Sequence, residues 1–133
     1  MKKNPTKQTL STDNAPKPIG PYSQAVLANG LLFISGQISI DPKENRVELF
    51  GGDCAKQCER IMQNLENILQ AAGLDWHDVV KTTVYLTQLE NFPVVNHVYG
   101  KFFGNQPPAR ATVGVAKLPA NAAIEIEAIA VTK

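Results

Sequence analysis

The chain has 133 residues, of which 44% are hydrophobic and 19% are charged, and its formal net charge is +1. This length and composition predict one globular domain, residues 1–133, with enough apolar side chains to bury a core. The near-neutral charge argues against nucleic-acid or anionic-membrane partners, and no apolar run is long enough for a membrane span.

Residues 1–18 are polar and contain Pro5, Pro16 and Pro18, so we expect extended chain with a mobile extension over residues 1–8. The positive start is not followed by an apolar segment, which argues against a signal peptide and favours a cytoplasmic protein. Gly20-Pro21-Tyr22 predicts a turn that leaves Tyr22 at the mouth of the first strand. On its own, a tyrosine there is better explained by packing than by catalysis.

Two apolar runs, residues 26–28 and 31–38, flank Asn29-Gly30 and predict a β-hairpin with a type I′ turn. The second run is apolar on both faces as far as Ile34, which indicates cover on both faces, from helices on one side and another subunit on the other. Ser35-Gly36-Gln37 interrupts that run, and the glycine permits a bulge or the close approach of a ligand.

The first long helix begins after Asp53, a plausible N-cap, and apolar residues then recur at steps of three and four as far as Ala72. Gly73 ends it. Cys54 and Cys58 lie on the apolar stripe, one turn apart and unsuited to a disulfide. Without a nearby histidine or second cysteine pair they make a poor zinc site, so we interpret both as core residues and expect no metal.

Residues 79–86 are rich in β-branched side chains and predict a strand, and His77 before them is interpreted as a surface residue. The second helix opens at Asn91-Phe92-Pro93, ends at Gly104 and carries Asn96 and the surface residue His97. Four apolar residues spaced along it predict its buried stripe: Phe92, Val95, Tyr99 and Phe102.

A strand is predicted directly after Pro107-Pro108, and its alternation places Arg110 and Thr112 on one face with only small neighbours. That leaves space beside the guanidinium for a planar anion. The final strand, residues 124–131, places Glu125 and Glu127 opposite its apolar face. A hairpin through residues 117–121 would set Glu125 near the arginine strand, although the sequence leaves the register open and solvated strand faces remain the alternative.

The resulting order of elements is strand, strand, helix, strand, helix, strand, strand, which predicts a two-layer α+β domain with helices on a sheet. Gly51-Gly52 lacks the residues of a phosphate-binding loop, and Ser35 lacks the glycine that precedes a nucleophile elbow. What remains is an arginine, an embedded glutamate, a turn tyrosine and a strand broken by glycine. Such a set could hold a small carboxylate and a water.

Five motifs, in order, resemble the RidA family (YjgF/YER057c/UK114), and the match runs from about Thr9 to Lys133. They are Gly20-Pro21-Tyr22-Ser23-Gln24-Ala25, Ser35-Gly36-Gln37, Lys81-Thr82-Thr83-Val84, Pro108-Ala109-Arg110 and Ile124-Glu125-Ile126-Glu127-Ala128-Ile129-Ala130. The resemblance implies a chorismate-mutase-like fold, with a mixed sheet and two helices on one face. It also implies a homotrimer around a central barrel-like core, with ligand sites in the clefts between subunits.

The resemblance further implies an activity that needs no cofactor. It is the hydrolytic deamination of reactive 2-imino acids and their enamine tautomers, such as 2-aminoacrylate, 2-iminopropanoate and 2-iminobutanoate, to 2-keto acids and ammonia. Pyridoxal-phosphate dehydratases acting on serine and threonine release these intermediates. Three residues would be catalytic: Arg110 would bind the substrate carboxylate, Glu125 would position a water and take its proton, and Tyr22 would hold that water or the substrate.

The substrate-binding residues implied in the same way, besides Arg110, are Thr112, through its backbone N–H, Gly36, through its carbonyl, and Ser35. Phe92 and Asn96 would line the cleft. Many members of the family carry cysteine where this chain has Thr112, so a mechanism that requires a thiol there is excluded. Two other functions are considered: a non-catalytic trimer that binds keto acids or amino acids through Arg110, and RNA cleavage or translation inhibition, which the near-neutral charge argues against.

Overall fold

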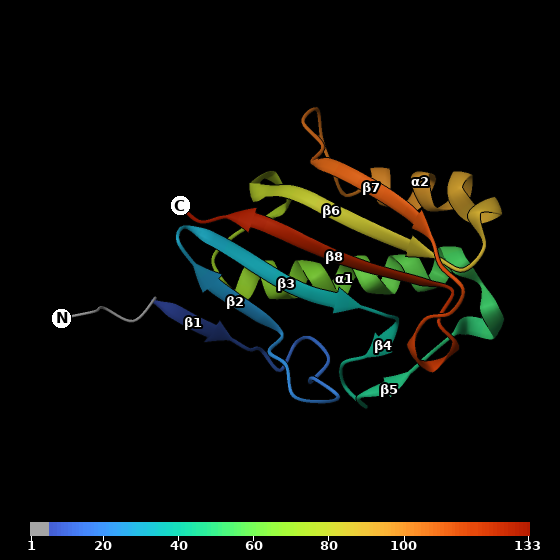
Figure 1. Cartoon of the computed structure of the whole chain (residues 1–133), viewed down its shortest axis with the longest axis horizontal. Helices are drawn as coiled ribbons and strands as arrows, with labels where there is room; N and C mark the ends of the chain where they lie inside the picture. The colour runs from blue at the N-terminus through green and yellow to red at the C-terminus, as the bar shows by residue number, and fades with distance from the viewer. Residues whose placement is uncertain (1–5) are drawn as a thin grey trace.

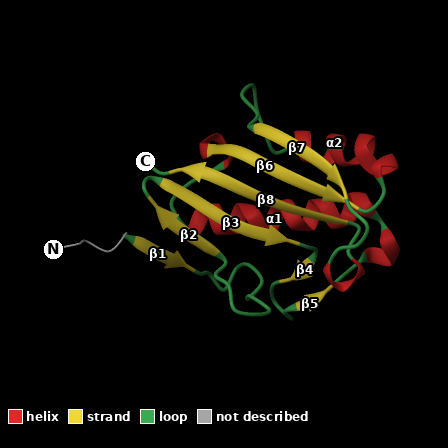
Figure 2. Cartoon of the chain, viewed as in Figure 1, coloured by secondary structure: helices red, strands yellow, loops and turns green. Residues whose placement is uncertain are grey.

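The computed structural model describes residues 6–133, which form two layers, a mixed sheet and two helices on one of its faces (Figures 1 and 2). The predicted α+β fold is therefore confirmed. The helices are α1 (Cys54–Ala71) and α2 (Phe92–Gly100). The spatial order of the strands is β1 (Lys7–Leu10), β2 (Ala25–Ala28), β3 (Leu31–Gln37), β8 (Ile124–Val131), β6 (Val79–Leu86) and β7 (Ala109–Gly114).

The predicted hairpin is formed by β2 and β3, which pair antiparallel. Its turn residues Asn29 and Gly30 both have positive φ, 51° and 76°, as a type I′ turn requires. The pairing of β3 with β8 shifts register between Ile34 and Gln37, so a bulge occurs where the glycine-containing break predicted one.

The N-terminal segment differs from the prediction. Lys7 and Gln8 belong to β1 and pair with β2, so they are not part of a mobile extension, and residues 1–5 of that predicted extension lie outside the described residues. A second short hairpin, β4 (Ile40–Asp41) with β5 (Arg46–Val47), forms around the predicted polar turn. Both additions involve strands too short to show a period of two in the sequence.

Helix α1 begins and ends as predicted. The Asp53 carboxylate accepts a hydrogen bond from the Lys56 N–H at 3.1 Å and so caps the helix. At the other end Gly73 has φ of 73°, and the Leu74 N–H donates to the Leu69 carbonyl at 2.9 Å, which is a Schellman motif. Both ends of the helix therefore satisfy backbone groups that would otherwise lack partners.

The hydrophobic core lies between α1 and the sheet. Side chains from the helix interleave with alternate residues of the central strands, and all of the following are buried: Leu32, Ile34, Ile61, Leu65, Ile68, Val84, Leu86, Ile124 and Ile126. The intervening strand residues face the other way, onto a surface that no element of the described chain covers. There Phe33 and Val113 are each 41% exposed. Residues 6–133 thus cover only one face of the sheet.

Helix α2 ends at Gly100, four residues before the predicted Gly104. Beyond it the Phe102 N–H donates to the Tyr99 carbonyl at 3.2 Å, a turn of three residues rather than a helical one. Phe102 packs edge-on against Trp76, with ring centroids 5.7 Å apart, just after the helix has ended. Val95 and Tyr99 of the predicted stripe are buried, but Phe92 is 39% exposed.

The last strands are not joined in the predicted hairpin. Strand β7 pairs in parallel with β6 at the edge of the sheet, while β8 pairs antiparallel with both β3 and β6. A parallel pair needs a crossover, and α2 supplies it by returning the chain to the same end of the sheet. Residues 117–121 then carry the chain past β6 into the centre (Figure 1). The hairpin prediction was wrong because adjacency in sequence does not fix adjacency in a mixed sheet.

The N-cap gives a stability prediction. Replacing Asp53 by Ala leaves an N–H of the first turn of α1 unpaired and should lower the free energy of unfolding by about 1 kcal/mol. Urea denaturation followed by circular dichroism at one fixed protein concentration measures the change. Asp13→Ala, which removes an exposed carboxylate from a turn, is the matched control and should have little effect. Equal destabilisation by both variants would contradict the capping role.

Candidate functional site

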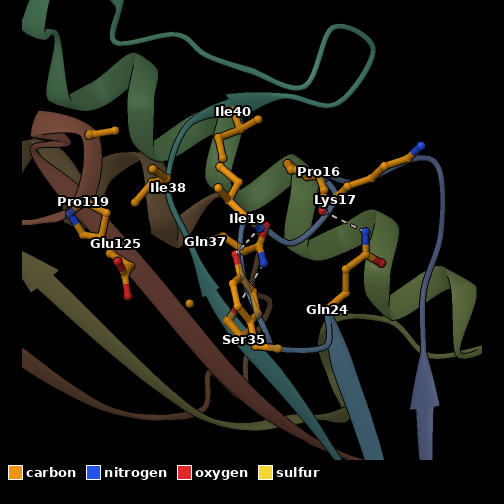
Figure 3. A pocket seen from close by; sticks show the side chains of 13 residues that line it. Pro16, Lys17, Ile19, Gln24, Ser35, Gln37, Ile38, Ile40, Pro119 and Glu125 are labelled. Atoms are coloured by element: carbon orange, nitrogen blue, oxygen red, sulfur yellow. Dashed lines mark hydrogen bonds between the residues drawn. The ribbon is translucent and has the colours of Figure 1, made fainter.

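A pocket of about 580 Å³ opens at the end of β3, where the segment before β2 crosses it (Figure 3). Four of the predicted site residues line it together: Tyr22, Ser35, Gly36 and Glu125. We call these four the glutamate side. Apolar side chains make up much of the remaining wall, among them Ile19, Ile38, Ile40 and Pro119. The pocket therefore places one carboxylate in a largely apolar hollow.

Glu125 lies against the bulge of β3. The ladder between β3 and β8 pairs Ile34 and Gln37 with β8 but skips Ser35 and Gly36. A Cβ atom added to Gly36 would collide with Oε2 of Glu125, so only glycine lets the carboxylate rest on this backbone. Burial raises the pKa of the Glu125 carboxyl, and the negative charge of Glu127 raises it further. The group is thereby a better proton acceptor than an exposed glutamate.

Tyr22 and Ser35 have different hydrogen-bonding states. The Tyr22 side chain is half-exposed and its hydroxyl oxygen accepts a hydrogen bond from the Ile19 N–H at 3.2 Å, which leaves the phenolic hydrogen able to donate. The Ser35 hydroxyl donates to the Ser23 carbonyl at 2.5 Å. In this arrangement Ser35 fastens the bulge to the preceding segment, whereas Tyr22 keeps a donor for a ligand or water.

Arg110 lies on β7, beside α2. Its guanidinium carbon is 5.4 Å from the ring centroid of Phe92 and 4.8 Å from that of Tyr99, so two aromatic rings hold the cation. Within residues 6–133 no carboxylate lies within 4.0 Å of it. Next to it is a hollow of about 490 Å³ lined by Tyr99, Phe103 and Pro107-Pro108. The positive charge is therefore oriented but not neutralised.

Two further predicted residues accompany the arginine. The Val115 N–H donates to the Leu86 carbonyl, and because N–H groups alternate along a strand, that of Thr112 points away from β6 toward the outer edge of the sheet. Asn96 lies one turn after Phe92 on α2, and its Oδ1 atom is buried without a hydrogen-bond partner in the described part of the chain. We call Arg110, Thr112, Phe92 and Asn96 the arginine side. It offers free donors and one unsatisfied acceptor.

The structure separates these two groups of predicted residues. Arg110 is the register partner of Thr82, and Glu125 is the register partner of Tyr85, three residues farther along β6. Side chains three apart on a strand point to opposite faces. Arg110 therefore faces the helices and Glu125 faces the uncovered side of the sheet, so within one chain the predicted meeting of these two side chains does not occur.

Sequence reasoning missed one residue that contacts the arginine side. Tyr99 was assigned to the core of α2, and it is buried, but its ring also lies against the guanidinium of Arg110. Phe92 and Tyr99 are seven residues apart and so share one face of the helix. Two aromatic residues at that spacing, in the helix that leads into an arginine strand, are the signal that could have identified the contact.

Comparison with known proteins gives the family. The family model described as endoribonuclease L-PSP matches residues 12–132. The chain belongs to this family. A human protein named 2-iminobutanoate/2-iminopropanoate deaminase is 45% identical over 94% of this chain and 90% of its own length. A RutC family protein from Pyrococcus horikoshii is 50% identical over 93% of this chain and 97% of its own.

Solved structures agree with these relatives. RidA from an Antarctic Psychrobacter superposes with a TM-score of 0.88 and 40% identity, covering 93% of this chain and 98% of that one. TdcF from Escherichia coli, solved with bound serine, gives 0.87 and 38%, covering 95% and 99%. The resemblance to RidA read from the motifs is confirmed, and so is the fold that it implied.

Within residues 6–133 of this RidA-family chain no group of three or more His, Cys, Asp or Glu side chains is arranged to hold a metal ion. No helix in the same range is long and apolar enough to cross a membrane. Cys54 and Cys58 are buried free thiols, as predicted. Burial raises the pKa of Cys54 to about 11 and that of Cys58 to about 12. Since the thiolate is the reactive form, both should be inert.

This inertness can be measured. In the native protein at pH 8, a thiol-specific chromogenic reagent should label neither Cys54 nor Cys58 over minutes, because both are buried and protonated. After unfolding in guanidinium chloride, both should react rapidly. A Cys54→Ala variant assigns any residual signal to one position. Rapid native labelling of either thiol would contradict the interpretation of both as core residues.

Proposed function

We propose that this protein hydrolyses 2-imino acids and their enamine tautomers, 2-aminoacrylate, 2-iminopropanoate and 2-iminobutanoate among them, to 2-keto acids and ammonia. One observation carries the proposal: an unneutralised guanidinium and a carboxylate of raised pKa are each held, ready for a ligand, on surfaces that one chain leaves open. The human relative's name supports the substrate class.

We propose further that the site forms between copies of a homotrimer, with the arginine side of one copy meeting the glutamate side of its neighbour. The uncovered sheet face supports this, since apolar Phe33, Val113 and Val131 are partly exposed there and apolar side chains gathered on one face often mark an interface. Among residues 6–133, strand β7 lies at an unpaired edge of the sheet and no donor reaches the buried Asn96 Oδ1, so a neighbour or ligand would supply one.

In the proposed reaction Arg110 binds the substrate carboxylate through two parallel hydrogen bonds, and the Thr112 N–H adds a third. This fixes the imine carbon close to a water beside Glu125. The carboxylate accepts a proton from the water as its oxygen bonds to the imine carbon, and it returns that proton to the imine nitrogen. In the resulting carbinolamine the same carboxylate takes the hydroxyl proton and passes it to the amino group. The C–N bond then breaks, ammonia leaves, and the C=O bond of the keto acid forms.

The remaining residues of the glutamate side orient the reactants. The phenolic hydrogen of Tyr22 donates to the attacking water or to the substrate, and the Gly36 carbonyl, outside the β3–β8 ladder, accepts the imine N–H. The reaction uses no thiol, since residue 112 of this chain is a threonine and both cysteines are buried elsewhere, on α1. Positioning alone suffices for an electrophile as reactive as an imine.

A non-catalytic regulatory trimer would use the same arginine, and the serine bound to the TdcF relative gives this alternative a basis. Release of ammonia from freshly generated 2-aminoacrylate separates the two, since a sensor would bind without accelerating it. The family description also mentions an endoribonuclease. A net charge of +1 provides little electrostatic attraction for RNA, so that activity is not favoured.

The shared site gives a complementation prediction. Arg110→Ala and Glu125→Ala should each abolish nearly all ammonia release. When the two variants are unfolded together in equal amounts and refolded, random assembly should restore about one quarter of wild-type activity, because one junction in four pairs an intact arginine side with an intact glutamate side. Imines generated in situ by an amino acid oxidase provide the assay.

Two controls make the result decisive. Each variant refolded alone should stay inactive, and the two variants mixed without unfolding should gain activity only as fast as subunits exchange. A site built within one chain would give no recovery on co-refolding, because every chain would carry one broken half. That outcome would contradict the inter-subunit site. The loss of ammonia release in each single variant would still test whether Arg110 and Glu125 take part in the reaction.

The raised pKa of Glu125 gives a pH prediction. Glu125 must be deprotonated to accept a proton, so kcat should fall as the pH drops through its raised pKa. Glu127→Gln removes a nearby negative charge, which lowers the pKa of Glu125 and should move the acid limb of the pH–rate profile to lower pH. Glu59→Gln, on the exposed face of α1, is the control. An acid limb that stays in place in Glu127→Gln would overturn the assignment.

A further inference from the structure

Tyr99 and Thr82 form a buried polar contact next to the arginine side that the proposed reaction does not use. The Tyr99 hydroxyl and Thr82 Oγ1 are 2.7 Å apart, and the two residues are only 5% and 1% exposed. The Tyr99 ring lies 4.8 Å from the Arg110 guanidinium, closer than the ring of Phe92. A single buried side chain is thus anchored at one end and in contact with the cation at the other.

We propose that Tyr99 is a positioning residue: its ring, held in place by Thr82, orients the guanidinium of Arg110 so that the hydrogen-bonding edge faces the incoming carboxylate. This inference rests on the proposed function only in naming the ligand that the arginine binds. The orientation itself is a property of the free protein and can be tested without any substrate.

The geometry of the sheet makes the anchor effective. Thr82 is the direct register partner of Arg110 on the neighbouring strand, and both side chains face the helices. The Thr82 hydroxyl fixes the Tyr99 ring relative to β6, and the ring then fixes the guanidinium relative to the same strand. Tyr99 comes from α2, so the contact joins the helix and both strands of the crossover into one rigid unit.

The chemistry of the guanidinium and the aromatic ring explains how this contact favours binding of an anion. A guanidinium that packs on the π face of a ring keeps its N–H donors in its own plane, where they remain available to a bidentate anion. A carboxylate of the protein in the same place would occupy those donors. An arginine with neither kind of partner would sample many rotamers and lose that freedom on binding. The aromatic contact orients the cation without competing for it.

If Tyr99 had only a structural role in the core, it would not need to contact Arg110. A buried phenol needs one hydrogen-bond partner and an apolar surround, and Thr82 together with the ring of Phe103, at a centroid distance of 4.7 Å, already provides both. Contact with Arg110 is not required for either. The two roles therefore separate in variants that keep or remove the ring.

The first measurement needs no ligand. In ¹⁵N relaxation of the Arg110 Nε–H group, assigned by its loss in Arg110→Lys, the order parameter should be high in the wild type. It should be somewhat lower in Tyr99→Phe, which keeps the ring but loses the hydroxyl contact with Thr82, and lowest in Tyr99→Leu, which loses both. Val95→Ala, a buried truncation one turn earlier on α2, serves as the matched control for lost packing and should leave Arg110 ordered. Unchanged order in Tyr99→Leu would overturn the proposal.

The second measurement reads the consequence for binding. The Kd of 2-oxobutanoate, measured by calorimetry, should rise about tenfold in Tyr99→Leu and no more than about threefold in Tyr99→Phe, the range expected when one cation–π contact is lost or kept. The rate at saturating imine should change by less than about twofold in both. Equal affinity in Tyr99→Leu and wild type, or a loss of rate without a loss of affinity, would count against positioning.

These results remain distinguishable from a failure of the proposed function. A wild type that binds 2-oxobutanoate but does not accelerate imine hydrolysis would refute the function and leave the Tyr99 comparison intact. Should the wild type bind no keto acid at all, the relaxation measurement alone decides. A wild type that hydrolyses imines while Tyr99→Leu changes neither order nor affinity would refute the positioning role and leave the function standing.

Discussion

The insertion of β8 between β3 and β6 is the constraint on which the rest of the molecule depends. It makes β7 an edge strand, reached through the α2 crossover, and it turns Arg110 and Glu125 to opposite faces of one sheet. Because side chains alternate strictly along a strand, no rotamer change brings these groups together within one chain. Any chemistry that needs both residues must therefore draw them from two copies.

Each charged group is held in its own surroundings, on its own face of the sheet. On one face, a bulge and a glycine let Glu125 lie on bare backbone in an apolar pocket, where burial favours its protonated form. On the other, aromatic rings hold Arg110 without neutralising it. An ion pair within the chain would stabilise both groups but leave neither free for a substrate. Their separation across the sheet prevents that pair from forming.

Features that depend on neighbouring residues, such as turns, helix caps and strand-forming runs, were predicted well from the sequence. The order of the strands in the sheet was not. Asn29-Gly30 specified its hairpin, Asp53 and Gly73 bounded α1, and the β-branched run predicted β6 correctly at both ends, because each depends on neighbours in sequence. Strand order depends on which edges meet after collapse, so the expected hairpin before β8 was wrong. The candidate residues were identified from family motifs, but their separation onto two faces follows only from the register.

Tyr99 shows why the sequence does not reveal which side chains a buried residue contacts. Its helical spacing indicates a buried position, and the structure confirms that it is buried, yet burial alone does not say which side chains it contacts. The contact with Arg110 arises because Thr82, paired across from the arginine, anchors the hydroxyl and so aims the ring. One aromatic residue thus serves the core and the candidate site together. A substitution judged harmless to the core could therefore still disturb the arginine.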